Sequence, residues 1–118
     1  MGNYVEIQSR RKAHEIVLLV HRLICQSKLK GKDIENLKNS SSNVAAELYE
    51  AHGRIFEDEK IKHISKSRGY LYEAKYYINL LNDIGRINRY VKKDMVLKID
   101  LLDKLLISMI RNKEMSIR

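Results

Sequence analysis

The 118-residue sequence contains no proline, and this absence restricts the possible folds more than any other feature. Proline and glycine supply many of the tight turns that join short β-strands. With five glycines as well, the chain has few residues suited to the turns of a β-sandwich or β-barrel. At 44% hydrophobic residues, it is also too apolar for a wholly disordered protein. The sequence therefore favours a single, largely helical domain over residues 1–118.

Apolar residues recur at intervals of three and four, the spacing that places them on one face of an α-helix. This pattern predicts four helices, over residues 4–29, 42–56, 58–87 and 90–113. We expect the Lys-Gly-Lys segment 30–32 to end the first helix and the polar segment 39–43 to supply N-caps for the second. Four helices with short connections indicate an all-α, antiparallel, up-and-down four-helix bundle.

Two expectations concern how the middle helices pack. The apolar stripe of the second helix is narrow and consists of Val44, Leu48, Ala51 and Ile55. Gly69 lies inside the third helix, where glycine costs about 1 kcal/mol relative to alanine. We therefore expect Gly69 to mark a point of close packing against a neighbouring helix.

Nothing in the sequence points to a membrane or to secretion. The chain has no run of about 18 apolar residues, and residues 1–6 lack the basic and then apolar layout of a signal peptide. Cys25 cannot form a disulfide within the chain, so we expect it to be a small core residue in a reducing compartment. These observations predict a cytoplasmic protein.

The last predicted helix has more apolar surface than a bundle core needs. One stripe suits the core and consists of Met95, Ile99, Leu102, Leu106 and Met109. A second stripe beside it consists of Leu97, Leu101 and Leu105. We expect the second stripe to form an interface between copies of the chain, the alternative being a broad contact within the core.

No group of residues has the spacing of a catalytic or metal site. His14 and His21 are seven residues apart, about 10 Å along a helix, which is too far to share a metal ion. His52 and His63 have no cysteine or paired carboxylate at ligand spacing. Cys25 has no recognisable base beside it in the sequence. We expect no catalytic residues, no metal and no cofactor.

Three charged residues are better explained by structure than by acid–base chemistry. Glu50 and Arg54 have the i,i+4 spacing that stabilises a helix. Glu73 is placed to meet Arg54 or Arg68 across two helices. We interpret Glu50, Arg54 and Glu73 as a structural polar network.

Basic residues carry the clearest functional signal. The chain has 23 Lys and Arg against 15 Asp and Glu, a net charge of +8, and much of the excess falls in two runs within 60–93. Tyrosines are interleaved with these runs, and tyrosine rings can stack on unpaired bases. The alternatives are a contact with an acidic protein surface or a role in solubility alone. The candidate phosphate-binding residues are Lys60, Lys62, Lys66, Arg68, Arg86, Arg89, Lys92 and Lys93.

Two short blocks resemble a known family. Residues 43–54 read Asn-Val-Ala-Ala-Glu-Leu-Tyr-Glu-Ala-His-Gly-Arg, and residues 67–73 read Ser-Arg-Gly-Tyr-Leu-Tyr-Glu. They resemble the patterns S-I-x-x-N-I-A-E-G-x-G-R and G-S-L-x-E of the four helix bundle protein family. The matching positions are Val44, Leu48, Glu50, Ala51, Gly53, Arg54, Gly69, Leu71 and Glu73. The chain departs from the patterns at Glu47 and Tyr70, and it lacks the proline common after the Ser-Ile pair.

This family includes proteins encoded in intervening sequences of 23S ribosomal RNA genes, also called S23 ribosomal proteins. It also includes Avd, the accessory variability determinant of diversity-generating retroelements. The resemblance implies a non-enzymatic bundle that assembles as a homopentameric ring or barrel. Avd-type members bind a reverse transcriptase and its template RNA through basic surfaces.

By this resemblance, we expect an Avd-like scaffold that binds RNA, or RNA and DNA, together with a reverse transcriptase. The alternative is a protein of the ribosomal intervening-sequence branch that acts as a protein-interaction module without binding nucleic acid.

Overall fold

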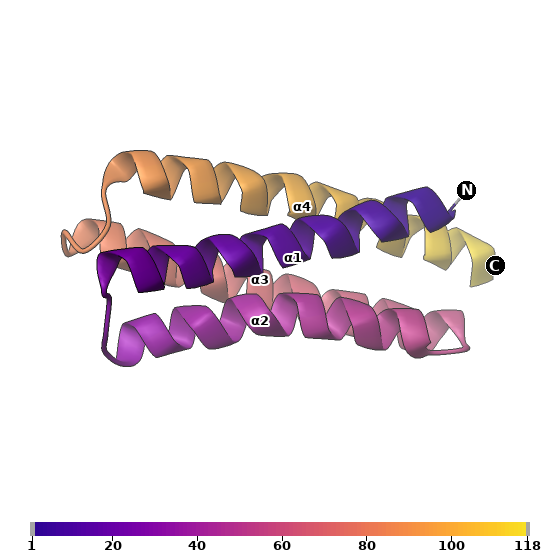
Figure 1. The fold of residues 1–118 in the computed structure, drawn as a ribbon. Coiled ribbons are helices and arrows are strands. Elements are labelled where there is room, and N and C mark those ends of the chain that lie inside the picture. The colour runs from indigo at the N-terminus through magenta and orange to yellow at the C-terminus, as the bar shows by residue number, and fades with distance from the viewer. Residues whose placement is uncertain (1, 118) are drawn as a thin grey trace.

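Helices account for nearly all of residues 2–117, the part of the chain that the computed structural model describes. Each helix runs antiparallel to the next, so the chain passes up and down along a rod of 48 × 21 × 18 Å (Figure 1). No strand occurs within residues 2–117, which confirms the expected all-α class with four helices. The helices are α1 (Gly2–Ser27), α2 (Lys32–Gly53), α3 (Glu57–Asp83) and α4 (Arg89–Ile117).

The core lies between two pairs of neighbouring helices. Both α1 and α3 pack against α2 and against α4, so the four helices surround one apolar interior. Every residue of the core stripe predicted for the last helix is buried. Burying one such side chain contributes roughly 1.5–3 kcal/mol. The largest fully buried apolar side chains are Val20, Ile34, Leu37, Val44, Ile64, Leu71, Ile78, Leu81, Ile99, Leu102 and Leu106.

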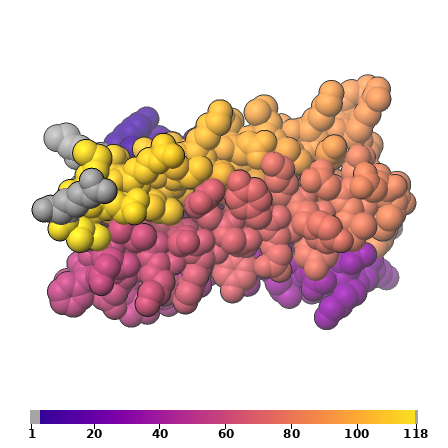
Figure 2. All heavy atoms as spheres, turned by 180° about the vertical axis from the view of Figure 1, so that it is seen from behind, coloured from indigo at the N-terminus to yellow at the C-terminus, as the bar shows by residue number. Residues whose placement is uncertain are grey.

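The up-and-down path gives the bundle two different ends. One end holds the connections 28–31 and 84–88, and we call it the loop end. The other end holds the turn 54–56, the start of α1 and the end of α4, and we call it the terminal end (Figure 1). In the view from behind, the loop end is at the right, where the orange start of α4 meets the salmon end of α3 (Figure 2).

The predicted start of the second helix is wrong by ten residues. α2 begins at Lys32 and passes without a break through the serine run that was expected to cap it. Ser40 and Ser41 are buried, and their hydroxyls donate to the backbone carbonyls of Asn36 (2.8 Å) and Lys38 (3.0 Å). Because each hydroxyl is satisfied by the preceding turn of the same helix, these serines need not end it.

Three predictions about packing are also wrong. Ile55 lies beyond the end of α2 in the turn 54–56 and is 84% exposed. Gly69 lies on the outer face of α3, where an added Cβ would meet nothing within 4 Å. Cys25 is exposed because a helical residue is turned by about 100° from its neighbour, and it is the preceding Ile24 that packs against the core.

The remaining helix ends differ less from the prediction. α1 ends at Ser27, followed by Lys28 in the left-handed conformation (φ 52°). α3 ends at Asp83 rather than 87, and α4 extends to Ile117 rather than 113. None of the helices within residues 2–117 is both long and apolar enough to cross a bilayer.

Candidate nucleic-acid interface

The eight predicted phosphate-binding residues lie toward opposite ends of the bundle. Lys60, Lys62, Lys66 and Arg68 are in the first half of α3, which begins at the terminal end. Arg86, Arg89, Lys92 and Lys93 are in the connection 84–88 and the start of α4, at the loop end. The rise of a helix puts roughly 32 Å between Lys62 and the end of α3 at Asp83, just before the second group begins. The structure therefore keeps the residues of 86–93 together at the loop end and separates them from the residues of 60–68.

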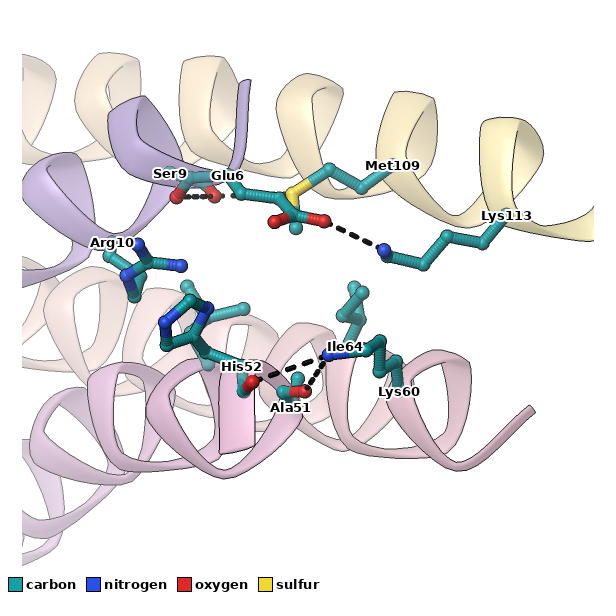
Figure 3. Close-up of a pocket in the computed structure, with 10 residues that line it drawn as sticks. Glu6, Ser9, Arg10, Ala51, His52, Lys60, Ile64, Met109 and Lys113 are labelled. Atoms are coloured by element: carbon teal, nitrogen blue, oxygen red, sulfur yellow. Dashed lines mark hydrogen bonds and ion pairs between the residues drawn. The ribbon is translucent and has the colours of Figure 1, made fainter. Parts of the chain in front are cut away.

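Lys60 is used within the bundle. Its ammonium donates to the backbone carbonyls of Ala51 (3.1 Å) and His52 (3.2 Å), which belong to the last turn of α2 (Figure 3). Carbonyls at a helix C-terminus lack partners in their own helix, so this contact caps α2. Lys62 and Lys66, by contrast, are exposed.

Arg68 is also held by a neighbouring helix. Its guanidinium donates to the carboxylate of Asp103 on α4, at 2.6 Å from Nε, and the hydroxyl of Tyr72 donates to the same carboxylate at 3.1 Å. The hydrogen bond to Asp103 raises the pKa of Arg68. Two turns further along α3, Lys75 donates to Asp100 at 2.9 Å, and this bond raises the pKa of Lys75. Acidic residues of α4 thus neutralise the basic residues along this side of α3.

The predicted link through Glu73 is wrong. Glu73 is exposed, and within residues 2–117 no hydrogen bond or ion pair joins it to Arg54 or Arg68. Arg54 pairs with Glu50 along α2 at 3.1 Å, with both side chains about half exposed. The expected three-residue network is therefore one surface ion pair, which contributes little to stability.

The loop end gathers more basic residues than the sequence runs indicated. Lys28 and Lys30 lie in the connection between α1 and α2, and Lys32 is the first residue of α2. All three lie at the same end as the 86–93 group. Segments 28–35 and 83–94 together hold seven Lys and Arg against four Asp and Glu. Their common location follows from topology, because the first and third connections of an up-and-down bundle lie at the same end.

Short-range hydrogen bonds set the path of the connection 84–88. Gly85 has φ 77°, a conformation that glycine adopts readily, and the Arg86 amide donates to the Leu81 carbonyl at 2.8 Å. The Asn88 side chain then accepts from the amides at positions 90 and 91 and starts α4. The Arg86 side chain reaches from this connection to Gly31 in the connection 28–31. A Cβ added at Gly31 would be in van der Waals contact with Arg86 Nη1, at 3.7 Å. The two connections are therefore close together across the loop end.

Charge at the start of α4 is unfavourable within the isolated chain. The first turn of α4 contains Arg89 and Lys92 and no acidic residue. A helix N-terminus carries partial positive charge and is stabilised by acidic rather than basic residues. Within residues 2–117, none of the seven loop-end cations takes part in a side-chain hydrogen bond or an ion pair.

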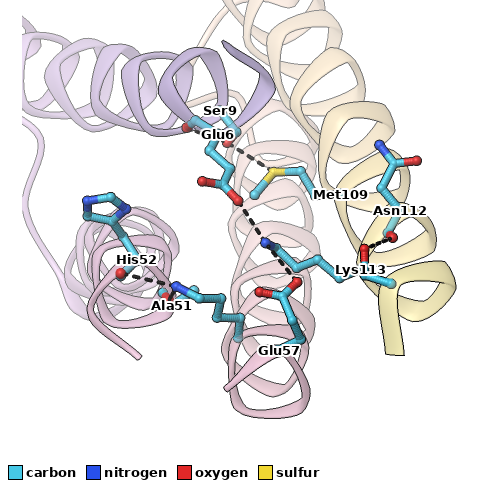
Figure 4. Close-up of polar contacts among 10 residues, drawn as sticks. Glu6, Ser9, Ala51, His52, Glu57, Met109, Asn112 and Lys113 are labelled. Carbon is cyan, nitrogen blue, oxygen red and sulfur yellow. Dashed lines mark hydrogen bonds and ion pairs between the residues drawn. The ribbon is translucent and has the colours of Figure 1, made fainter. Parts of the chain in front are cut away.

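At the terminal end, a polar cluster joins three helices. The Lys113 ammonium on α4 lies 2.7 Å from the Glu6 carboxylate of α1 and 3.5 Å from that of Glu57 on α3 (Figure 4). Burial raises the pKa of Glu6, but the hydrogen bond from Lys113 and the charges of Lys113, Lys60 and Arg10 outweigh burial. The net effect is a pKa of Glu6 below its usual value.

The cluster borders two cavities. Glu6, Glu57 and Lys113 line an open hollow of about 420 Å³ at the terminal end, together with Val5, Met109, Asn112 and Ser116. Glu6, Arg10, His52, Lys60 and Lys113 are among the residues around a cavity of about 10 Å³ (Figure 3), which is space for one water molecule at most. Within residues 2–117, no three His, Cys, Asp or Glu side chains lie together in a way that would hold a metal ion. The cluster's clearest role is to hold the helices together.

The predicted interface residues of α4 are accessible. Leu97 is 59% exposed, Leu101 is 44% exposed and Leu105 is half-buried. Lys12 and Glu15 of α1 line a shallow hollow of about 210 Å³ together with Leu97 and Leu101. An apolar strip thus borders α1 along the outside of the bundle.

The fold is similar to that of a solved protein. No family model and no curated protein matches the sequence. Among solved structures, the chain is similar to a protein of unknown function from the S23 ribosomal protein family of Bacteroides thetaiotaomicron, with a TM-score of 0.76 and 24% identity. The alignment covers 90% of this chain and 97% of that one. The two proteins share the four-helix fold over nearly their whole lengths.

Proposed function

We propose that this protein is a non-catalytic scaffold that binds nucleic acid through its loop end. One observation carries the proposal: the seven basic residues of segments 28–35 and 83–94 meet at this end with no side-chain hydrogen bond or ion pair within residues 2–117, whereas Lys60, Arg68 and Lys75 on α3 are used within the bundle. Phosphates of a nucleic acid would neutralise this charge with the release of counterions.

A protein partner belongs to the same proposal. The strip formed by the exposed Leu97 and Leu101 and the half-buried Leu105 supports assembly of several copies. The resemblance of the sequence to Avd-type proteins suggests a pentamer and a reverse transcriptase partner. The second candidate function is a protein-interaction module without nucleic-acid binding. The apolar strip on α4 is the observation that favours it.

Salt-dependent binding tests the proposal. We expect a fluorescently labelled, 20-nucleotide RNA to bind at about 50 mM salt, with an affinity that falls steeply as salt is added. The double variant K92A/K93A should reduce the slope of log K against log salt by about 1–2, because two phosphate contacts are lost.

The chain offers a matched control. The variant K62A/K66A removes the same charge from exposed positions on α3 at a distance from the loop end, and it should leave the slope nearly unchanged. No measurable affinity for RNA or DNA at low salt would refute nucleic-acid binding. An equal loss of slope in both variants would refute the assignment to the loop end.

A further inference from the structure

Tyr90 is an exposed aromatic residue within the basic loop end. It lies in the first turn of α4, beside Arg89 and close in sequence to Lys92 and Lys93, and it is 72% exposed. Within residues 2–117 its hydroxyl forms no hydrogen bond. The side chain thus contributes little to the packing of the bundle.

Two exposed tyrosines of α3 have contacts with neighbouring side chains, as the Tyr90 ring has with Arg89. Tyr72 has the Arg68 guanidinium and the Lys75 ammonium each 5.9 Å from its ring centre, and it donates to Asp103. Tyr76 meets the ring of Tyr77 edge to face at 5.2 Å. Tyr72, with partners on two helices, is therefore less available to an outside partner than Tyr90.

The Tyr90 ring is positioned by local structure. The Asn88 side chain accepts from the Tyr90 amide at 3.0 Å and the Val91 amide at 2.9 Å, which holds the backbone beneath the ring. The Arg89 guanidinium lies over the ring, 5.6 Å from its centre. With 72% of the residue exposed, much of the ring surface remains open to a partner.

An exposed ring beside a guanidinium, at a basic end of the bundle, matches the chemistry of an unpaired nucleobase and its flanking phosphates. Aromatic side chains stack on bases of any sequence, while nearby Lys and Arg contact the backbone. A duplex does not offer this contact, because its bases are already stacked on one another.

We propose that Tyr90 stacks on an unpaired base, so that the ligand of the loop end is single-stranded nucleic acid. This inference rests on the proposed function and specifies the class of its ligand. RNA and DNA strands share the required chemistry, and a folded RNA would present it in a loop or at a free end.

Binding to matched single strands and duplexes tests this inference. We would measure the affinity of a 12-nucleotide RNA, the same sequence as single-stranded DNA, a blunt duplex of that length and heparin. Y90A should weaken single-strand binding by roughly 5- to 150-fold, the range expected for one lost stacking contact. Y90F keeps the ring and should bind nearly as the native protein does. Duplex and heparin binding should change little in Y90A.

A fluorescent base gives an independent readout. An oligonucleotide with 2-aminopurine between pyrimidines should lose fluorescence on binding the native protein and Y90F, but much less with Y90A at saturation. The variant Y76A removes an exposed tyrosine from the middle of α3 and serves as the control. Circular dichroism would check that every variant remains helical.

The outcomes separate this inference from the proposed function. If K92A/K93A reduces the salt slope while Y90A binds single strands like the native protein, phosphate contact stands and base stacking is refuted. Equal weakening of single strands, duplex and heparin by Y90A also refutes stacking, because it shows no preference for an unpaired base. If no nucleic acid binds at low salt, the proposed function fails and this inference fails with it.

Discussion

Lys113 in α4 donates a hydrogen bond to Glu6 in α1, with 2.7 Å between Nζ and Oε1, although the two residues are 107 positions apart. Their side chains are 12% and 20% exposed, and Glu57 of α3 lies within 3.5 Å of the same ammonium. The pair joins the first and last helices at the terminal end. We expect it to matter for stability in a pH-dependent way.

Replacing Glu6 with Gln should lower the free energy of unfolding at pH 7 by about 1–3 kcal/mol, because the largely buried Lys113 ammonium loses its best acceptor. The pKa of Glu6 is lower in the folded protein than its usual value of 4.5. The carboxylate's contribution is therefore fully present above pH 4.5 and is lost as the pH falls through the folded pKa.

Urea unfolding of the native protein and E6Q, followed at pH 7 and again at about pH 3, measures this effect. The difference between the two proteins should narrow at the lower pH. E50Q is the control, because Glu50 and Arg54 form an exposed pair worth at most about 1 kcal/mol. If E6Q lowers the free energy of unfolding by the same amount at both pH values, the negative charge of Glu6 is not the source of the stabilisation.

Ser67 provides a second test of the bundle's polar contacts. It is fully buried in α3, and its hydroxyl donates to the backbone carbonyl of Val44 in α2 at 2.8 Å. Ser67→Ala should lower the free energy of unfolding by about 1 kcal/mol, the usual net value of one buried hydrogen bond. The larger side chain of Ser67→Val should cost about 1–3 kcal/mol through overpacking. Chemical denaturation measures both, and the exposed variant Ser65→Ala should change stability by less than about 0.5 kcal/mol.

Two glycines should respond in opposite directions to the same substitution. Gly69 lies inside α3 with open space around its Cα, so Gly69→Ala should stabilise the protein by about 0.5–1 kcal/mol. Gly85 has φ 77° at the end of α3, so Gly85→Ala should destabilise it by about 1 kcal/mol. Thermal unfolding of the two variants gives the signs directly. A destabilising Gly69→Ala would indicate that this position is covered by a partner in solution.

The periodicity of apolar residues was enough to predict the helices and much of their buried face, because every turn that packs on the core needs an apolar side chain. The whole core stripe of α4 was predicted in this way. The start of α2 was not predicted correctly, because serine serves equally well as a helix cap or as a small residue inside a helix. What decides between these roles is whether Ser40 and Ser41 meet a neighbouring helix, and local sequence does not contain that information.

The candidate site was predictable in composition but not in geometry. Runs of Lys and Arg indicated where positive charge is concentrated. The engagement of Arg68 by Asp103, 35 residues away, depends on the relative register of α3 and α4, which no local pattern encodes. The presence of Lys28, Lys30 and Lys32 at the basic loop end could have been predicted from the sequence, because the up-and-down topology places the first and third connections at one end.

The outer face of α4 leads to a prediction about assembly. Leu97 and Leu101 are 59% and 44% exposed on a helix whose inner face is already buried in the core, and exposure of apolar surface to water is unfavourable. Multi-angle light scattering should give a mass near five protomers of 13.9 kDa for the native chain. L97E/L101E should reduce the mass to that of one protomer, because burying carboxylates in an apolar interface is costly. I55E, at an 84% exposed position in the turn 54–56, should leave the oligomer intact. A native chain that runs as a monomer at all concentrations would exclude this interface, and dissociation by I55E alone would place it at the terminal end instead.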